Sequence, residues 1–132
     1  MEDFWRFLEK AVEYGINLGA DFIEARAERI NKLYINFEKD RIIDVESSEL
    51  LGLGVTAIVK GARGYGFTTQ LSEENIKVAV KEAVSAAKAS VDVAGLPADP
   101  IEYKPREYDG NVPQVAKHPK DFPIEDKIDI AM

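Results

Sequence analysis

The sequence predicts an α+β domain, a two-layer sandwich in which two helices cover one face of an antiparallel sheet of about five strands. Apolar residues recur at three- and four-residue spacing near both ends of residues 1–92, and they alternate with polar residues between those ends. All six prolines fall at position 97 or later. A sheet with one apolar face needs a covering layer, and the flanking helices can supply it. The expected order is therefore α-β-β-β-β-β-α.

The two helices have recognisable ends. Apolar spacing predicts the first helix over residues 4–18, ended near Gly19. The second helix is expected to begin after Ser72, which is a good N-cap, with Glu73 and Glu74 in a first turn where acidic side chains are favourable. Its core spacing continues to about Val91.

Five short runs alternate with a period of two, and in each the residues expected to face the core are odd-numbered. The runs lie within residues 21–28, 33–38, 43–46, 51–59 and 63–67. Constant parity requires loops of odd length between antiparallel neighbours. We therefore expect three-residue loops at 29–31, 39–41 and 60–62, the last of which would place Val59 opposite Arg63.

This parity puts a strip of glycines on the outer face of neighbouring strands. Glycine within a strand often marks the close approach of another backbone or a ligand, so the strip is a candidate interface. The same glycines also fit a second interpretation, in which they only allow bulges and twist. The candidate interface residues are Gly52, Gly54, Thr56, Gly64, Gly66 and Thr68.

The proline-rich residues 93–132 are expected to form a linker or tail beyond a domain of residues 1–92. An amphipathic pattern begins at Ile124, with Pro123 in its first turn, and runs to the last residue. We expect this helix to continue in a longer parent chain, because so short a helix is marginal alone. A natural frayed C-terminus is the alternative.

Composition narrows the class of protein. The chain has 132 residues, a length typical of one domain, and no cysteine, so a disulfide framework and a thiolate zinc site are excluded. The net charge of −7 disfavours nucleic acid as a partner. The acidic N-terminus is unlike a secretory signal, and no apolar run is long enough for a membrane span. A cytoplasmic protein without a membrane partner is expected.

No residue pattern predicts catalysis or metal binding in this chain. His118 is the only histidine and lies in His118-Pro119-Lys120 of the proline-rich tail, with no second imidazole or thiolate in the chain to share a metal. The carboxylate pair Glu24 and Glu28 falls on the expected outer face, where solvation explains it. The glycine clusters do not open a helix and lack a following Gly-Lys-Ser/Thr, so they do not form a phosphate loop. We therefore expect no catalytic residue, no metal site and no cofactor.

Several motifs together resemble a known family. Gly19-Ala20-Asp21-Phe22-Ile23-Glu24-Ala25-Arg26 follows the first helix, and Gly52-Leu53-Gly54-Val55 and Gly61-Ala62-Arg63-Gly64-Tyr65-Gly66-Phe67 come before an alanine-rich helix. In order and spacing these motifs are similar to the N-terminal domain of the TldD/PmbA family, once called modulators of DNA gyrase. The resemblance covers about residues 5–92.

The resemblance implies a parent zinc metallopeptidase that acts on unstructured peptides as a homo- or heterodimer of related subunits. In that family a His-Glu-x-x-x-His motif in the C-terminal domain holds the zinc, and this chain contains no such motif. Many members have Arg where this chain has Thr56, so the branch, catalytic or non-catalytic, stays open. The implied function is non-catalytic subunit pairing and substrate framing. The alternative is a stand-alone dimeric module that binds a peptide or protein.

Overall fold

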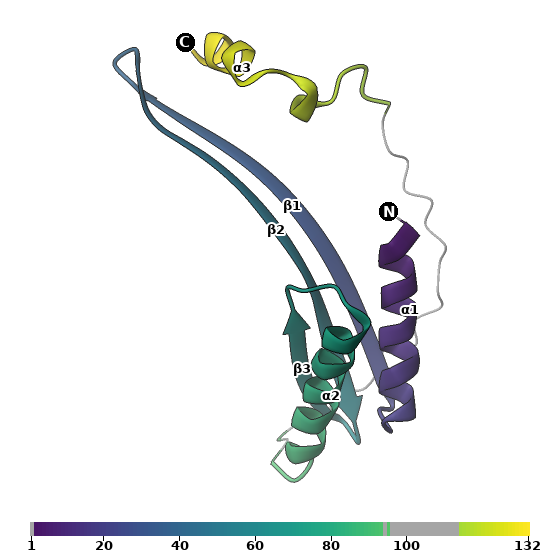
Figure 1. Ribbon diagram of the computed structural model, residues 1–132. Coiled ribbons are helices and arrows are strands. Elements are labelled where there is room, and N and C mark those ends of the chain that lie inside the picture. The colour runs from purple at the N-terminus through teal and green to yellow at the C-terminus, as the bar shows by residue number, and fades with distance from the viewer. Residues whose placement is uncertain (1, 94, 96–113) are drawn as a thin grey trace. The chain divides into compact units, whose positions relative to one another are not determined.

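The computed structural model describes residues 2–93, 95 and 114–132 (Figure 1). It confirms the α+β class, but its antiparallel sheet has three strands where five were expected. The described elements are α1 (Glu2–Asn17), β1 (Phe22–Glu38), β2 (Arg41–Val59), β3 (Ala62–Thr68), α2 (Glu73–Ala89), the 3₁₀ helix η1 (Pro119–Asp121) and α3 (Ile124–Ala131).

The chain divides into two compact units. The first comprises Met1–Ile30 and Glu49–Glu102, and the second comprises Asn31–Ser48 and Tyr103–Met132. The expected boundary between residues 92 and 93 stays a prediction. Four of the six prolines of the expected tail, at 97, 100, 105 and 113, lie outside the described residues.

Both expected helices of the first unit are confirmed. Helix α1 ends just before Gly19, whose φ of +91° is a left-handed conformation that glycine adopts without strain. The side chain of Ser72 caps α2 by accepting a hydrogen bond from Asn75 N at 3.2 Å. Lys88, in the last turn of α2, donates from Nζ to the carbonyl oxygen of Leu18 at 2.7 Å and so ties together the C-terminal ends of the two helices.

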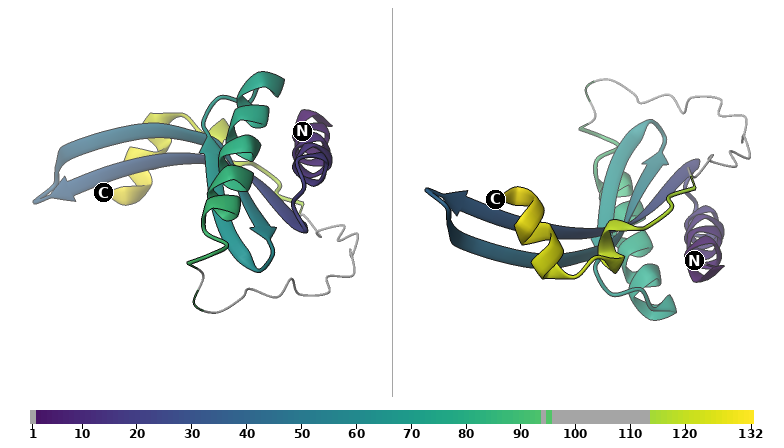
Figure 2. Two further views of the ribbon diagram at one scale, coloured as in Figure 1. Left: turned by 90° about the horizontal axis from the view of Figure 1, so that it is seen from below. Right: turned by 90° about the horizontal axis from the view of Figure 1, so that it is seen from above.

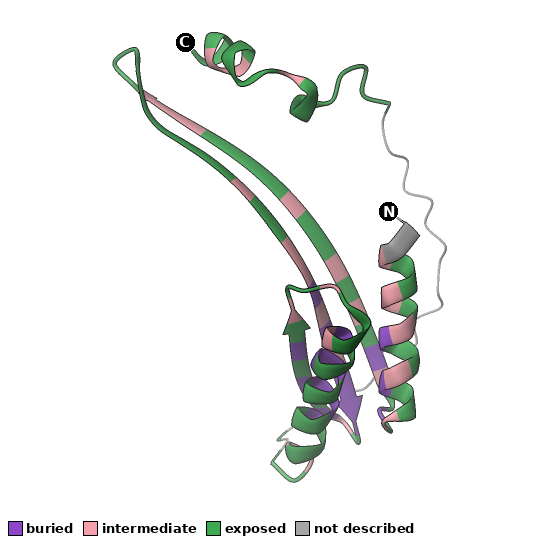
Figure 3. Ribbon diagram, in the orientation of Figure 1, coloured by how far each residue is buried: buried purple, intermediate pink, exposed green. Residues whose placement is uncertain are grey.

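The expectation of five strands was wrong, because the first and second expected strands form the single strand β1, and the third and fourth form β2. Residues 29–31, expected as a loop, continue β1, and residues 47–50 join the third and fourth runs into β2. Neither segment contains the glycine or proline that would favour a turn. No residue of 31–48 is buried, so burial does not mark where a strand continues and where it turns in this part of the chain (Figure 3).

The two turns of the sheet each have two residues, where three were expected. Lys39 and Asp40 join β1 to β2 with φ values of +49° and +61°, and Lys60 and Gly61 join β2 to β3 with +48° and +79°. Positive φ at both central residues is the requirement of a type I′ hairpin turn, whose twist matches that of the strands. At the second turn this geometry overrides the expectation of constant parity, whereas odd-numbered residues face the core on both β1 and β2 in the first unit, as Ile23 and Leu53 do.

The shorter second turn reverses the faces of β3. Val59 lies opposite Ala62, where Arg63 was expected, and Val55 lies opposite Gly66. The even-numbered residues of β3 consequently face the core, and Tyr65 and Phe67 face outward. This register corrects the expectation that odd residues of every strand face the core.

The core of the first unit lies between one face of the sheet and helices α1 and α2 (Figures 2 and 3). Leu53, Val55 and Ala57 supply its sheet side and are fully or almost fully buried. Ala11 of α1 and Val80 of α2 supply its helical side. This arrangement is the expected two-layer packing of two helices on one sheet face.

Helix α2 approaches β3 so closely that only glycine fits beneath it. A Cβ atom added to Gly66 would overlap the carbonyl oxygen of Ala79, and one added to Gly64 would overlap that of Ala83. These neighbours are backbone atoms, which cannot move aside without displacing the helix. Gly64 and Gly66 are therefore packing residues of the core.

The second unit contains the strand segments 31–48 and the C-terminal helices. Helix α3 confirms the amphipathic pattern expected from Ile124, with Pro123 at its N-cap. None of the residues in η1 and α3 is buried.

We predict that Gly66→Ala destabilises the domain by about 1–3 kcal/mol, the usual cost of overpacking. Gly52→Ala is the matched control, because a Cβ there meets only Thr68 O at 3.5 Å, an ordinary contact. The control should be neutral or slightly stabilising. Thermal unfolding of both variants measures the difference, and equal midpoints would mean that α2 does not pack on β3 as described.

An exposed ion-pair network joins α1 to α2. Lys10 Nζ lies 2.5 Å from Glu73 Oε2, and Lys77 Nζ lies 3.2 Å from Glu73 Oε1. The hydrogen bond from Lys10, and after it the one from Lys77, lowers the pKa of Glu73 from its ordinary value of 4.5. The network favours the charged carboxylate in the folded state.

Because the folded-state pKa of Glu73 is lowered, this contribution to stability is present above pH 4.5 and is lost as the pH falls through the lowered value. We expect Glu73→Gln to reduce the urea midpoint near neutral pH and to have progressively less effect in acid. Glu82→Gln, at another exposed position of α2, is the control. A Glu73→Gln deficit that persists unchanged in acid would contradict this account.

Candidate functional site

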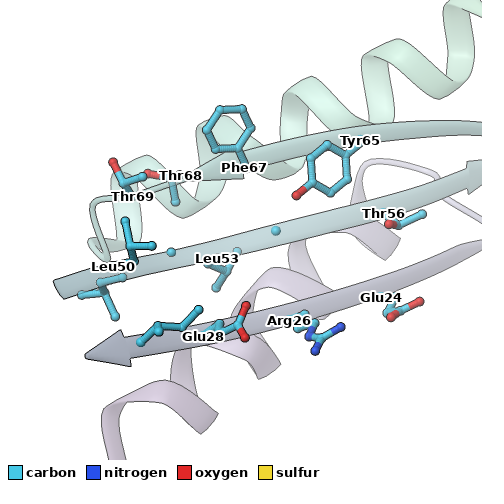
Figure 4. Close-up of a pocket in the computed structure, with 14 residues that line it drawn as sticks. Glu24, Arg26, Glu28, Leu50, Leu53, Thr56, Tyr65, Phe67, Thr68 and Thr69 are labelled. Carbon is cyan, nitrogen blue, oxygen red and sulfur yellow. The ribbon is translucent and has the colours of Figure 1, made fainter. Parts of the chain in front are cut away.

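The candidate site is the outer face of the sheet in the first unit, the face opposite α1 and α2 (Figure 4). Alternation along the three strands places three rows of side chains on this face. Thr56 lies opposite Tyr65, and Gly54 lies opposite Phe67. The rows are Glu24, Arg26 and Glu28 on β1, Gly52, Gly54 and Thr56 on β2, and Tyr65 and Phe67 on β3.

An open hollow of about 530 Å³ lies between these rows. Glycines of the central strand form its floor, because their lack of side chains lowers the surface along β2. Leu50 and Ile30 add apolar surface to the lining. Such a volume is within the usual range for sites that hold small ligands or a few side chains.

The wall on β3 is aromatic. Tyr65 and Phe67 are 62% and 65% exposed, and their stacked rings have centroids 6.3 Å apart. Tyr65 leans over Gly54, since a Cβ on Gly54 would lie 2.6 Å from the tyrosine Oη. The ring thus covers the floor at Gly54, whereas the floor at Gly52 has open space above it.

The wall on β1 is charged and carries a net negative charge. Glu24 and Glu28 flank Arg26, and all three side chains are exposed. Within the part of the chain that the structure describes, no ion pair joins these three residues to others. The hollow therefore presents an acidic wall opposite an aromatic one.

Four of the six expected interface residues line the hollow, three of them on β2 and one, Thr68, at its edge. Gly52, Gly54 and Thr56 line the hollow, and their role as an interface stays a prediction. Gly64 and Gly66 face α2, and Thr68 lies opposite the core residue Leu53, although it reaches the edge of the hollow. The continuous glycine strip was thus wrong in geometry, because the two-residue turn at Lys60 moves β3 by one position.

Sequence reasoning missed Tyr65 and Phe67, which were expected in the core. The signal that could have identified them is the pair Lys60-Gly61, since a lysine followed by glycine between two apolar runs fits a two-residue turn. With such a turn, the even-numbered residues of β3 face the core, and the rings of Tyr65 and Phe67 are on the outer face of the sheet.

Among the described residues, no three His, Cys, Asp or Glu side chains lie close enough together to hold a metal ion, so these residues do not fit a zinc site. His118 caps η1, where its Nδ1 accepts a hydrogen bond from Lys120 N at 3.2 Å. The arrangement on the sheet face can bind and orient a ligand by contact and charge. No helix of the described residues is long and apolar enough to cross a bilayer.

Comparison with known proteins agrees with this fold. Residues 23–87 match the family profile described as PmbA/TldA metallopeptidase domain 1, which confirms the resemblance expected from the sequence. No curated protein sequence matches the chain significantly. Among solved structures, the crystal structure of TldE from Thermococcus kodakarensis matches with a TM-score of 0.57 at 18% identity. That match covers 63% of this chain and 19% of the TldE chain, and it concerns the fold alone.

Proposed function

We propose, from the membership of residues 23–87 in the PmbA/TldD metallopeptidase family, that this chain is a non-catalytic first domain of such a peptidase, which frames polypeptide substrates and pairs subunits. The uncovered sheet face carries this proposal. An exposed apolar surface on a folded domain commonly marks a binding site for protein. The match covers 19% of the TldE chain, and the proposal assigns catalysis to parts of a parent protein outside this chain.

Substrate framing uses the hollow on the outer face. Its aromatic wall supplies large, rigid contact area at a low cost in side-chain entropy. Its glycine floor allows another backbone to approach closely. The parent peptidase would gain a surface that holds an unstructured polypeptide without cutting it.

Subunit pairing uses the strand segments 31–48 of the second unit. In these segments β1 and β2 have no described third strand beside them, because β3 pairs with β2 only between Leu53 and Val59. A two-stranded ribbon is marginally stable in water, and its open edges and apolar side chains favour addition of a partner. The exposed apolar residues here are Leu33, Tyr34, Ile42, Ile43 and Val45.

We predict that the chain, incubated with zinc and a pool of short labelled peptides of mixed composition, binds peptides without cleaving them. Phe67→Thr should weaken binding several-fold, because it removes a ring from the wall but keeps a residue that favours strands. Val78→Thr, on the exposed side of α2, is the control. Zinc-dependent cleavage that survives repurification, or the absence of any peptide binding, would overturn the framing role.

We further predict that the chain self-associates and that the double variant Ile43→Thr, Val45→Thr weakens the association at least several-fold. Both changes keep β-branched residues, so the strands should persist while the apolar surface shrinks. Sedimentation equilibrium measures the association, with Phe67→Thr as a control that should still pair. A chain that stays monomeric at every accessible concentration would contradict pairing through residues 31–48.

A further inference from the structure

Helix α1 carries a row of exposed apolar side chains that the core does not use. Trp5, Val12 and Ile16 are 69%, 38% and 48% exposed. Their spacing of seven and four residues aligns them along one side of the helix over about 16 Å. Single exposed apolar residues are ordinary, but an aligned row that includes a tryptophan is typical of a surface where another protein packs. We call this row the α1 stripe.

The stripe lies outside the contacts that hold α1 in the first unit. Three consecutive residues show this, because successive side chains on a helix are about 100° apart. Lys10 faces α2, where it forms an ion pair, and Ala11 is fully buried in the core. Val12 is on the remaining side, away from α2. The ring of Tyr14, with Lys77 Nζ 6.0 Å from its centroid, also lies on the α2 side.

The solvent-facing flank of the stripe carries a net negative charge. Glu9 neighbours Trp5 at four-residue spacing, Glu13 neighbours Ile16 at three-residue spacing, and both glutamates are exposed. In the part of the chain that the structure describes, neither carboxylate is in an ion pair. Arg6 is on the same flank and offsets one of the two charges. The flank therefore attracts a partner whose apolar side chains have basic neighbours.

A second copy of the chain fits the stripe poorly. In an antiparallel pair of identical helices, two-fold symmetry brings each flank against the same flank of the other copy. Glu9 and Glu13 would then face their own counterparts, and like charges across an interface oppose association. The net charge of −7 on each copy adds to this repulsion.

We propose that the α1 stripe docks an amphipathic helix of a partner protein whose apolar face is flanked by Lys or Arg. A helix that packs on another helix presents apolar anchors at four- and seven-residue spacing, which is the spacing of the stripe. The stripe spans about three turns, which is long enough to contact several anchors of such a helix. This interaction goes beyond substrate framing and subunit pairing, for which other residues of the chain are proposed.

Trp5 is the only tryptophan of the chain, so its fluorescence reports directly on the stripe. The test titrates the full chain with a basic helical peptide that lacks tryptophan, Ala-Leu-Lys-Ala-Lys-Leu-Ala-Ala-Leu-Lys-Ala-Lys-Leu-Ala-Lys. The matched control peptide has Glu at every Lys position. We expect the basic peptide to shift the Trp5 emission to shorter wavelength in a saturable manner. The acidic peptide should bind roughly tenfold more weakly or less, with a difference that shrinks in high salt.

Variants of the chain locate the binding. The double variant Val12→Gln, Ile16→Gln should weaken binding of the basic peptide roughly tenfold, because it removes apolar contact area but keeps residues that favour a helix. Ile16→Gln alone, at the more exposed position, replaces it if the unfolding midpoint of the double variant falls. Val78→Gln, at a 51% exposed position of α2, is the matched control and should change nothing.

Saturable binding of the basic peptide that is weakened by the stripe variants and not by Val78→Gln supports the proposal. Equal binding of the basic and acidic peptides overturns it, as does binding that the stripe variants leave unchanged or no binding at all. An emission shift that depends on the concentration of the free chain means that a second copy occupies the stripe. Emission at short wavelength with protection from acrylamide in the dilute free chain means that the chain covers its own stripe. Either of these last two results also overturns the proposal.

Discussion

The close approach of α2 to β3 is the constraint on which the rest of the first unit depends. Helix α2 lies so close to β3 that a Cβ atom at Gly64 would overlap the carbonyl oxygen of Ala83, and one at Gly66 would overlap that of Ala79. The face of β3 that touches the helix therefore has no room for rings. Tyr65 and Phe67 are consequently on the opposite face, and the outer surface of the sheet acquires its aromatic wall.

Helices were predictable from the sequence and strand register was not, for a physical reason. Ser72 and Gly19 mark helix ends through local backbone chemistry, which depends little on the rest of the fold. Which face of β3 is buried depends on the long-range contact between β3 and α2. The expectation that large apolar residues face the core fails there, because only glycine fits between the strand and the helix. The hollow was therefore predicted only through Gly52, Gly54 and Thr56, and its aromatic half was missed.

The lengths of β1 and β2, each of which joins two runs expected as separate strands, were also not predictable from local sequence patterns. Residues 31–48 include no buried residue, so burial does not mark whether the chain continues or turns between the short runs. Polar residues such as Arg29 and Asn31 can then continue a strand, because hydrogen bonding along the backbone tolerates any side chain that stays solvated. The short alternating runs predicted separate strands, whereas the structure joins them into the long strands β1 and β2.

The core and the hollow lie on opposite faces of one sheet. Val55 and its odd-numbered neighbours on β2 are packed in the core, whereas Gly54 and Thr56 between them face the hollow. A substitution on the outer face changes contact area or charge without opening a cavity, so its cost to folding is small. Because Tyr65 and Phe67 are exposed, the domain lacks the stability that burial of their rings would add. Such a loss of stability is common at binding surfaces. Substitutions at residues such as Glu24 and Gly52 can therefore alter the shape and charge of the hollow while the helix-covered face, fixed by Gly64 and Gly66, keeps the fold the same.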